Sequence, residues 1–173
     1  LRNNSAAGST ANGIVVSAGA SLEIQGGIAV GTEPLTLNGG AANELVNIGG
    51  VNTWGGPVTL AVAASDIVCS ADTLIISGQI GGAMGINKTG SGTLVLRGAN
   101  TYTGSTTINA GCLATNAADR IADMSNIVLA NVSGVMLSLG GNETIGSLSG
   151  GGTTGGDISL GIYTLTVTQA TSL

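Results

Sequence analysis

The chain has 173 residues, enough for one domain of ordinary size, and a net charge of −5 with only 8% charged residues. Its four basic residues are scattered, so the sequence offers no basic patch for phosphates and argues against nucleic-acid binding. A hydrophobic content of 43% argues against disorder, and no apolar run reaches the ~18–20 residues of a membrane helix.

Short runs of β-branched or alternating residues, separated by glycine, predict strands along the whole chain. The predicted strands are residues 13–17, 21–25, 28–30, 34–38, 44–48, 58–62, 66–69, 73–77, 93–97, 105–109, 126–130, 135–139, 144–148, 157–160 and 163–168. Residues 117–124 are the least β-like and predict a longer loop or a short helical turn. With 31 glycines, no phenylalanine and 2% aromatic residues, the core has to be an aliphatic, regular stack.

Like strands recur at a fixed spacing. Residues 71–78 align with residues 91–98 at an offset of 20, which places Leu74 over Leu94 and Ile76 over Leu96. Such an offset is about one coil of a right-handed parallel β-helix, an all-β solenoid with about 20 residues per coil. We therefore expect eight or nine coils, about 40 Å long at ~4.8 Å per rung. The predicted core of the stack is Leu74, Ile76, Leu94, Leu96, Ile108, Leu165 and Val167.

A longer repeat overlies this spacing. Residues 14–27 resemble residues 127–141 at an offset of 113 to 114, and Leu1 recurs as Leu113 at an offset of 112. We interpret residues 1–173 as a single solenoid segment with about one and a half copies of a unit of about 112–115 residues.

The most informative stretch is residues 90–113, in which two short runs flank a corner rich in asparagine and threonine. It resembles the autotransporter-associated β-strand repeat, also called the passenger-associated transport repeat. The matching positions are Gly90, Gly92, Thr93, Leu94, Leu96, Gly98, Asn100, Thr101, Tyr102, Thr103, Gly104, Thr106, Thr107, Asn109, Gly111 and Leu113. The resemblance implies a right-handed β-helical segment of a large bacterial protein, secreted or displayed on the cell surface. Asn100, Tyr102, Gly104 and Gly111 form the motif corner.

Catalytic chemistry finds little support in the sequence. Histidine is absent, which removes Ser-His-Asp triads and histidine metal sites, and we assign no catalytic, cofactor or metal residues. Asp119, Arg120 and Asp123 form the best acidic cluster, which we interpret as a solvated loop. Cys69 and Cys112 are 43 positions apart, about two coils, which is too far for a disulfide, so we expect two free, buried thiols.

Three functions remain open. The first is a non-catalytic stalk or filament unit of an extracellular bacterial surface protein. The second is an adhesin module for glycan or host matrix, for which Trp54 and Tyr102 are candidate stacking aromatics. The third, a β-helical polysaccharide enzyme, is disfavoured because its acidic and basic site groups are missing.

The ends of the solenoid predict the partner. Both terminal rungs lack a neighbouring strand and carry no proline or cluster of charge that would block edge pairing. We therefore expect head-to-tail contacts through Leu1, Tyr163, Leu165 and Val167. The partner is either a second copy or adjoining repeats of the same polypeptide. The alternative is a fragment whose missing coils lie in a parent chain.

Overall fold

The computed structural model describes residues 1–7, 12–40 and 42–168, and within these ranges every regular element is a strand. The strands are β1 (Ile14–Val16), β2 (Leu22–Gln25), β3 (Ala29–Val30), β4 (Leu35–Leu37), β5 (Leu45–Gly49), β6 (Asn52–Trp54), β7 (Val58–Leu60), β8 (Ser65–Cys69), β9 (Thr73–Ile76), β10 (Ile80–Gly82), β11 (Ile86–Thr89), β12 (Thr93–Leu96), β13 (Thr106–Ile108), β14 (Cys112–Thr115), β15 (Asn126–Leu129), β16 (Met136–Ser138), β17 (Glu143–Ile145), β18 (Ser147–Gly150), β19 (Asp157–Ser159) and β20 (Leu165–Val167). None of the described residues belongs to a helix long and apolar enough to span a membrane.

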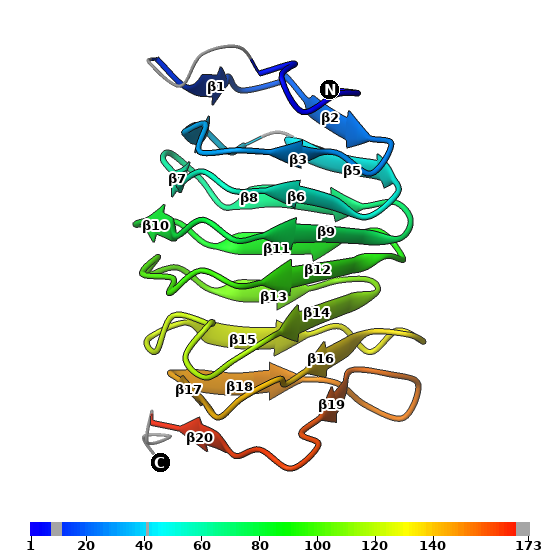
Figure 1. Cartoon of the computed structure of the whole chain (residues 1–173). Helices are drawn as coiled ribbons and strands as arrows, with labels where there is room; N and C mark the ends of the chain where they lie inside the picture. Colours follow the sequence, from blue (N-terminus) through cyan, green and yellow to red (C-terminus); the bar gives the residue numbers. More distant parts are fainter. Residues whose placement is uncertain (8–11, 41, 169–173) are drawn as a thin grey trace.

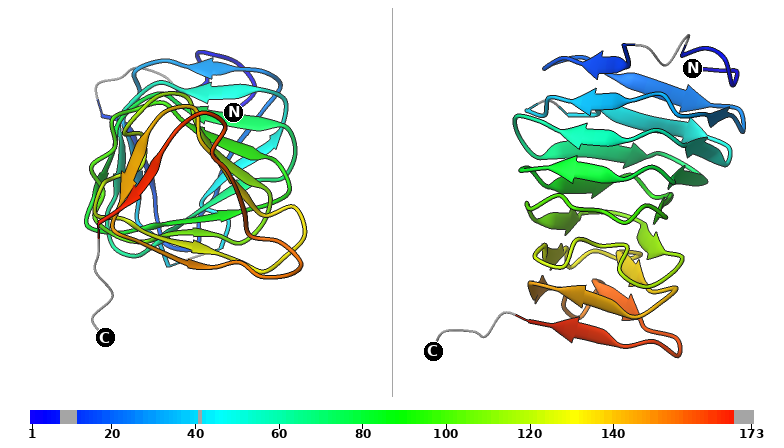
Figure 2. Two further views of the ribbon diagram at one scale, coloured as in Figure 1. Left: turned by 90° about the horizontal axis from the view of Figure 1, so that it is seen from below. Right: turned by 60° about the vertical axis from the view of Figure 1, so that its left-hand side comes forward.

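The strands stack as a right-handed parallel β-helix, as the sequence predicted (Figure 1). Sheet A contains β1, β4, β7 and β10. Sheet B holds seven strands, from β2 through β5, β8, β11, β13 and β15 to β18, and sheet C holds seven, from β3 through β6, β9, β12, β14 and β16 to β19. The face of sheet A is interrupted near residues 98–125 and resumes as the pair β17 and β20. Seen along the axis, the coils surround one interior (Figure 2).

The coils vary in length. Leu74 pairs with Leu94, 20 residues on, and Leu94 with Leu113, 19 residues on. The next step, from Leu113 to Leu137, takes 24 residues because residues 116–125 form a loop rather than a strand. The predicted spacing therefore holds around residues 74–113. The expectation of eight or nine coils was wrong, because the longer corners leave about seven turns, as the seven-stranded sheets show.

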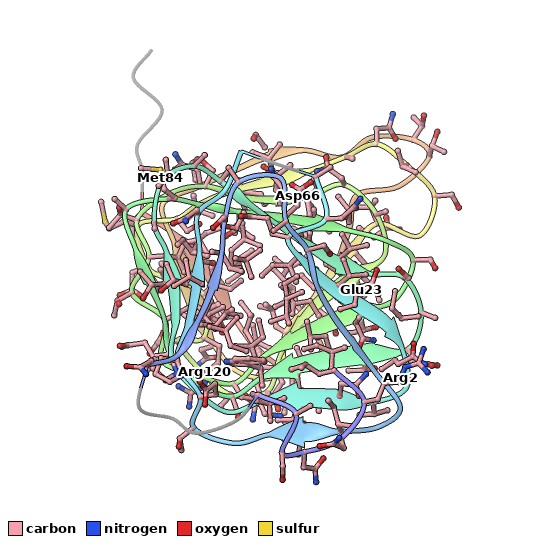
Figure 3. All side chains as sticks on the ribbon, turned by 90° about the horizontal axis from the view of Figure 1, so that it is seen from above. Arg2, Glu23, Asp66, Met84 and Arg120 are labelled. Carbon is pink, nitrogen blue, oxygen red and sulfur yellow. The ribbon has the colours of Figure 1, made fainter. Side chains whose placement is uncertain are left out.

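The core is a set of inward-pointing ladders, with side chains filling the interior (Figure 3). Leu74, Leu94, Leu113 and Leu137 stack in sheet C, and all four are fully buried. Burying such ladders stabilises the stack because each aliphatic side chain is covered by the rungs above and below it.

The predicted core residues fall into two groups. Leu74, Ile76, Leu94, Leu96 and Ile108 are fully buried. Leu165 is only half-buried and Val167 is 45% exposed, so their assignment to the core was wrong. The physical reason is that β20 pairs only with β17, so no described coil covers its other side.

Four strands escaped prediction: β6, β10, β11 and β14. Their sequences contain Asn, Gly, Lys or Cys, which have weak strand preferences. They are strands because a neighbouring coil supplies a parallel partner, as for Ile86, whose N–H donates to the Ser105 carbonyl over 2.9 Å. The segment 117–124 is a loop, one of the two predicted alternatives.

The longer repeat stays a prediction. The segments that align in sequence occupy different faces, since Ile14 lies in sheet A and Ile127 in sheet B. Likewise Leu1 lies beside β2 of sheet B, where its carbonyl accepts from the Gln25 N–H over 3.1 Å, whereas Leu113 lies in sheet C.

Candidate functional site

The motif coil, which we define as residues 86–114, contains β11, β12, β13 and most of β14. Leu94 and Leu96 alternate with the half-buried Thr93 and Val95, so one face of β12 enters the core and the other faces outward. Between β12 and β13 the chain follows the motif corner. Thr101 and Thr103 there donate backbone N–H groups to the carbonyls of Ile80 (2.9 Å) and Gly82 (3.1 Å).

Tyr102 lies inside this corner and is 1% exposed. Its hydroxyl is 2.7 Å from Thr106 Oγ1, which is in turn 2.9 Å from Ser125 Oγ, and Ser125 donates to the Gly104 carbonyl over 3.0 Å. Burial raises the pKa of Tyr102 to about 12. Tyr102 and the fully buried Trp54 are therefore closed off from any glycan, and the idea that they stack on sugars was wrong.

Two further corner residues make close contacts between coils. Asn100 accepts from the Ile80 N–H over 2.7 Å through Oδ1 and donates to the Arg120 carbonyl over 2.6 Å, which links three successive coils. A Cβ on Gly104 would lie 2.7 Å from the Gly85 Cα, so only glycine allows this approach. Gly111 adopts a φ of +64°, a left-handed conformation that favours glycine.

Comparison with known proteins agrees with this geometry. Residues 86–114 match the family model Passenger-associated-transport-repeat. The chain carries a passenger-associated transport repeat. A relative from Brucella suis biovar 1 (strain 1330), named "Adhesin BmaC autotransporter", is 38% identical over 143 residues. The match covers 80% of this chain and 4% of that relative, so the chain spans only a small part of its length. No solved structure gives a significant match.

Sequence reasoning missed one residue of the passenger-associated transport repeat. Lys88, in β11, is fully buried, and its Nζ donates to the carbonyls of Thr89, Gly90 and Ala110 over 2.8 to 2.9 Å. Burial lowers the pKa of Lys88, and the thiols of Cys69 and Cys112 act in the opposite direction. The alternation Ile86, Asn87, Lys88 across β11 was the signal that Lys88 points inward.

The acidic cluster lies in the loop below the repeat. Asp119 and Asp123 are exposed, and the backbone N–H groups of Arg120 and Ile121 donate to the buried carboxylate of Glu143 over 2.9 to 3.1 Å. Among the described residues, no group of three or more His, Cys, Asp or Glu side chains could hold a metal ion. A shallow hollow lies beside this loop and is lined by Asn100, Thr101, Tyr102, Thr103, Ala122, Asp123 and Met124.

The two thiols are free, as expected. Cys69 is buried in β8, and burial raises its pKa to about 11. Cys112 lies on the outward side of β14 and is half-buried, so the expectation of two buried thiols was wrong for this residue. Alternation decides the difference, because Leu113 takes the inward position in β14.

The residues predicted to form an end-to-end interface lie at opposite ends of the stack. Leu1 packs against the core beside β2, and its N-terminal amine donates to the Glu23 carbonyl. Tyr163, Leu165 and Val167 lie on the final rung (Figure 1). Their contact with a partner remains a prediction.

Proposed function

We propose that this chain is part of the non-catalytic rod of a bacterial autotransporter passenger, exposed at the cell surface or outside the cell. The observation that carries the proposal is continuity. Sheets B and C run through seven strands each, with parallel pairing between every neighbouring pair of rungs. A stack in which each coil is bonded to the next is stiff along its axis, because bending it would break pairing in two sheets at once.

The relative and the repeat support the location. The relative is named an adhesin autotransporter, and the matched repeat is named for passenger transport. A surface with 8% charged residues and abundant Ser, Thr and Asn is consistent with a solvated rod.

A binding role is the second candidate, and the name of the relative favours it. The shallow hollow beside the motif corner is the place in the described structure that we assign to it. Thr101, Thr103 and Asp123 are exposed at its rim, and Met124 is 72% exposed.

Binding assays with the purified chain separate these two functions. Immobilised matrix proteins and a glycan array are titrated with the wild type and with the variant T101A/T103A/D123A. A rod predicts no saturable binding by either protein. Saturable binding that the variant loses, and that the control T59A on the exposed side of β7 retains, would replace the rod by an adhesin module.

We further propose that another coil covers the rung formed by β18, β19 and β20. These strands are paired on one side only. Leu148 and Val167 are 38% and 45% exposed, whereas their register partners Ile127 and Ile145 are fully buried. The covering coil comes from adjoining repeats of the polypeptide or from a second copy of the chain.

Light scattering over a concentration series tests association between copies. Head-to-tail stacking predicts a mass that rises with concentration. The rise should be abolished by V167K and kept by I162K, since Ile162 is 93% exposed. A monomer at every concentration would leave only adjoining repeats as the cover.

A further inference from the structure

Lys88 stands in a ladder that is otherwise aliphatic. Parallel register in sheet B places Leu45, Ile67, Lys88, Ile108 and Leu129 one above the other. Lys88 is fully buried and is the only lysine of the chain. An ammonium group inside a protein is unfavourable unless its hydrogen-bonding capacity is satisfied, so the contacts of Nζ decide what this residue does.

Three carbonyl groups converge on the Lys88 ammonium. Those of Thr89 and Gly90, both at 2.8 Å, belong to the corner between β11 and β12. The carbonyl of Ala110, at 2.9 Å, belongs to the corner one coil further on, between β13 and β14. Three acceptors match the three N–H donors of an ammonium, whereas a neutral amine offers two. The side chain therefore joins two successive corners.

The same pattern occurs two coils earlier with neutral side chains. Asn47 Nδ2 donates to the carbonyl of Gly50 in its own corner (3.3 Å) and of Ala71 in the next corner (2.9 Å). Asn52 Nδ2 donates to Asn47 Oδ1 over 2.6 Å and to the Gly49 carbonyl over 3.1 Å. Inward-facing carbonyls at this edge of the solenoid are thus bound by a buried donor in both places.

We propose that Lys88 is a built-in cation that binds the carbonyls of two successive corners and holds the motif coil in register with the coil that follows. Leucine or isoleucine at position 88 would continue the ladder but leave all three carbonyls without this donor. Charge is used because one flexible side chain then does what two asparagines do at the earlier corner.

The first test is hydrogen exchange in K88M, an apolar variant of similar length. The amide of Gly92 donates to the Cys69 carbonyl (2.8 Å) and that of Cys112 to the Gly92 carbonyl (3.3 Å), so both report on the two corners. We expect their exchange to accelerate at least about tenfold, with the Val58 amide of sheet A unchanged. R97M is the matched control, because Arg97 is exposed, and it should alter none of them. Unchanged protection of Gly92 and Cys112 in K88M would overturn the proposal.

The second test uses the wild type and decides the matter if K88M does not fold. Because the chain has one lysine, ¹⁵N-lysine labelling yields a single side-chain signal. An ammonium held by three buried carbonyls should exchange its protons at least about tenfold more slowly than free lysine at neutral pH. Exchange as fast as that of free lysine would show that the three hydrogen bonds are absent in solution and refute the proposal.

Discussion

Leu94 illustrates how a single inward residue stabilises the stack. It is fully buried between Leu74 above and Leu113 below. We expect Leu94→Ala to lower the free energy of unfolding by about 2–5 kcal/mol, because the cavity cannot be filled by the neighbouring rungs. Denaturant unfolding followed by circular dichroism measures the loss. The control is Val95→Ala, one position along on the outward side, which should cost below about 1 kcal/mol. Equal losses would mean that the two faces of β12 are reversed.

The two thiols should differ in reactivity. Cys69 is buried with its pKa raised to about 11, whereas Cys112 is half-buried on the outward face of sheet C. Since the thiolate is the reactive form, we expect a disulfide reagent at pH 8 to modify Cys112 at least about tenfold faster than Cys69. C112S should remove the fast phase and C69S should keep it. Both thiols should react rapidly in denaturant, and equal native rates would contradict the assignment.

Glu143 makes the stability depend on pH. Burial raises the pKa of its carboxyl, although the N–H groups of Arg120 and Ile121 act against this shift. A raised folded-state pKa stabilises the fold below the unfolded-state value, about 4.3, and this contribution disappears as pH rises through the folded-state value. Relative to E143Q, the wild type should therefore be more stable at pH 4 than at pH 7. Unfolding both proteins at the two pH values checks the sign, and a difference that grows toward pH 7 would contradict it.

At the scale of the element, glycine decides how closely a corner can approach the coil above. A Cβ on Gly104 would meet the backbone of Met84 and Gly85, whereas one on Gly31 would meet nothing within 4 Å. We expect Gly104→Ala to cost about 1–3 kcal/mol, because the corner must move and the Tyr102 network with it. Gly31→Ala should change stability by less than about 0.5 kcal/mol. Thermal unfolding of both variants distinguishes this from a general effect of replacing glycine.

At the scale of the whole molecule, the coil is the unit that can be removed. Leu74 and Leu94 occupy equivalent positions in register, so deleting residues 75–94 joins Leu74 to Val95 and keeps every ladder in phase. We expect this variant to fold with a β-rich circular dichroism spectrum and lower thermal stability, since it loses one coil of neighbour contacts.

Deleting residues 75–84 is the matched control. Removing half a coil shifts every later strand onto the wrong face, so this variant should not fold cooperatively. If both deletions fold equally well, the coils are not the stacking unit.

The fold class, the coil spacing near the motif and the buried ladder of Leu74 and Leu94 could be predicted from the sequence. They follow from alternation within a strand and from recurrence after 20 residues, and both patterns can be read along the chain. Tyr102 was correctly assigned to the motif corner, but the same pattern left open whether it faces solvent.

The burial of Lys88 and Tyr102, and the strands β6, β10, β11 and β14, were decided only by the tertiary structure. Each depends on groups about one coil away: the Ala110 carbonyl for Lys88, the Ser125 hydroxyl for the network of Tyr102, and a parallel partner for each short strand. Corner lengths set which groups meet, and they vary from coil to coil. Because pairing between coils supplies the partners that a weak strand or a buried polar group needs, no local pattern of residues can reveal them.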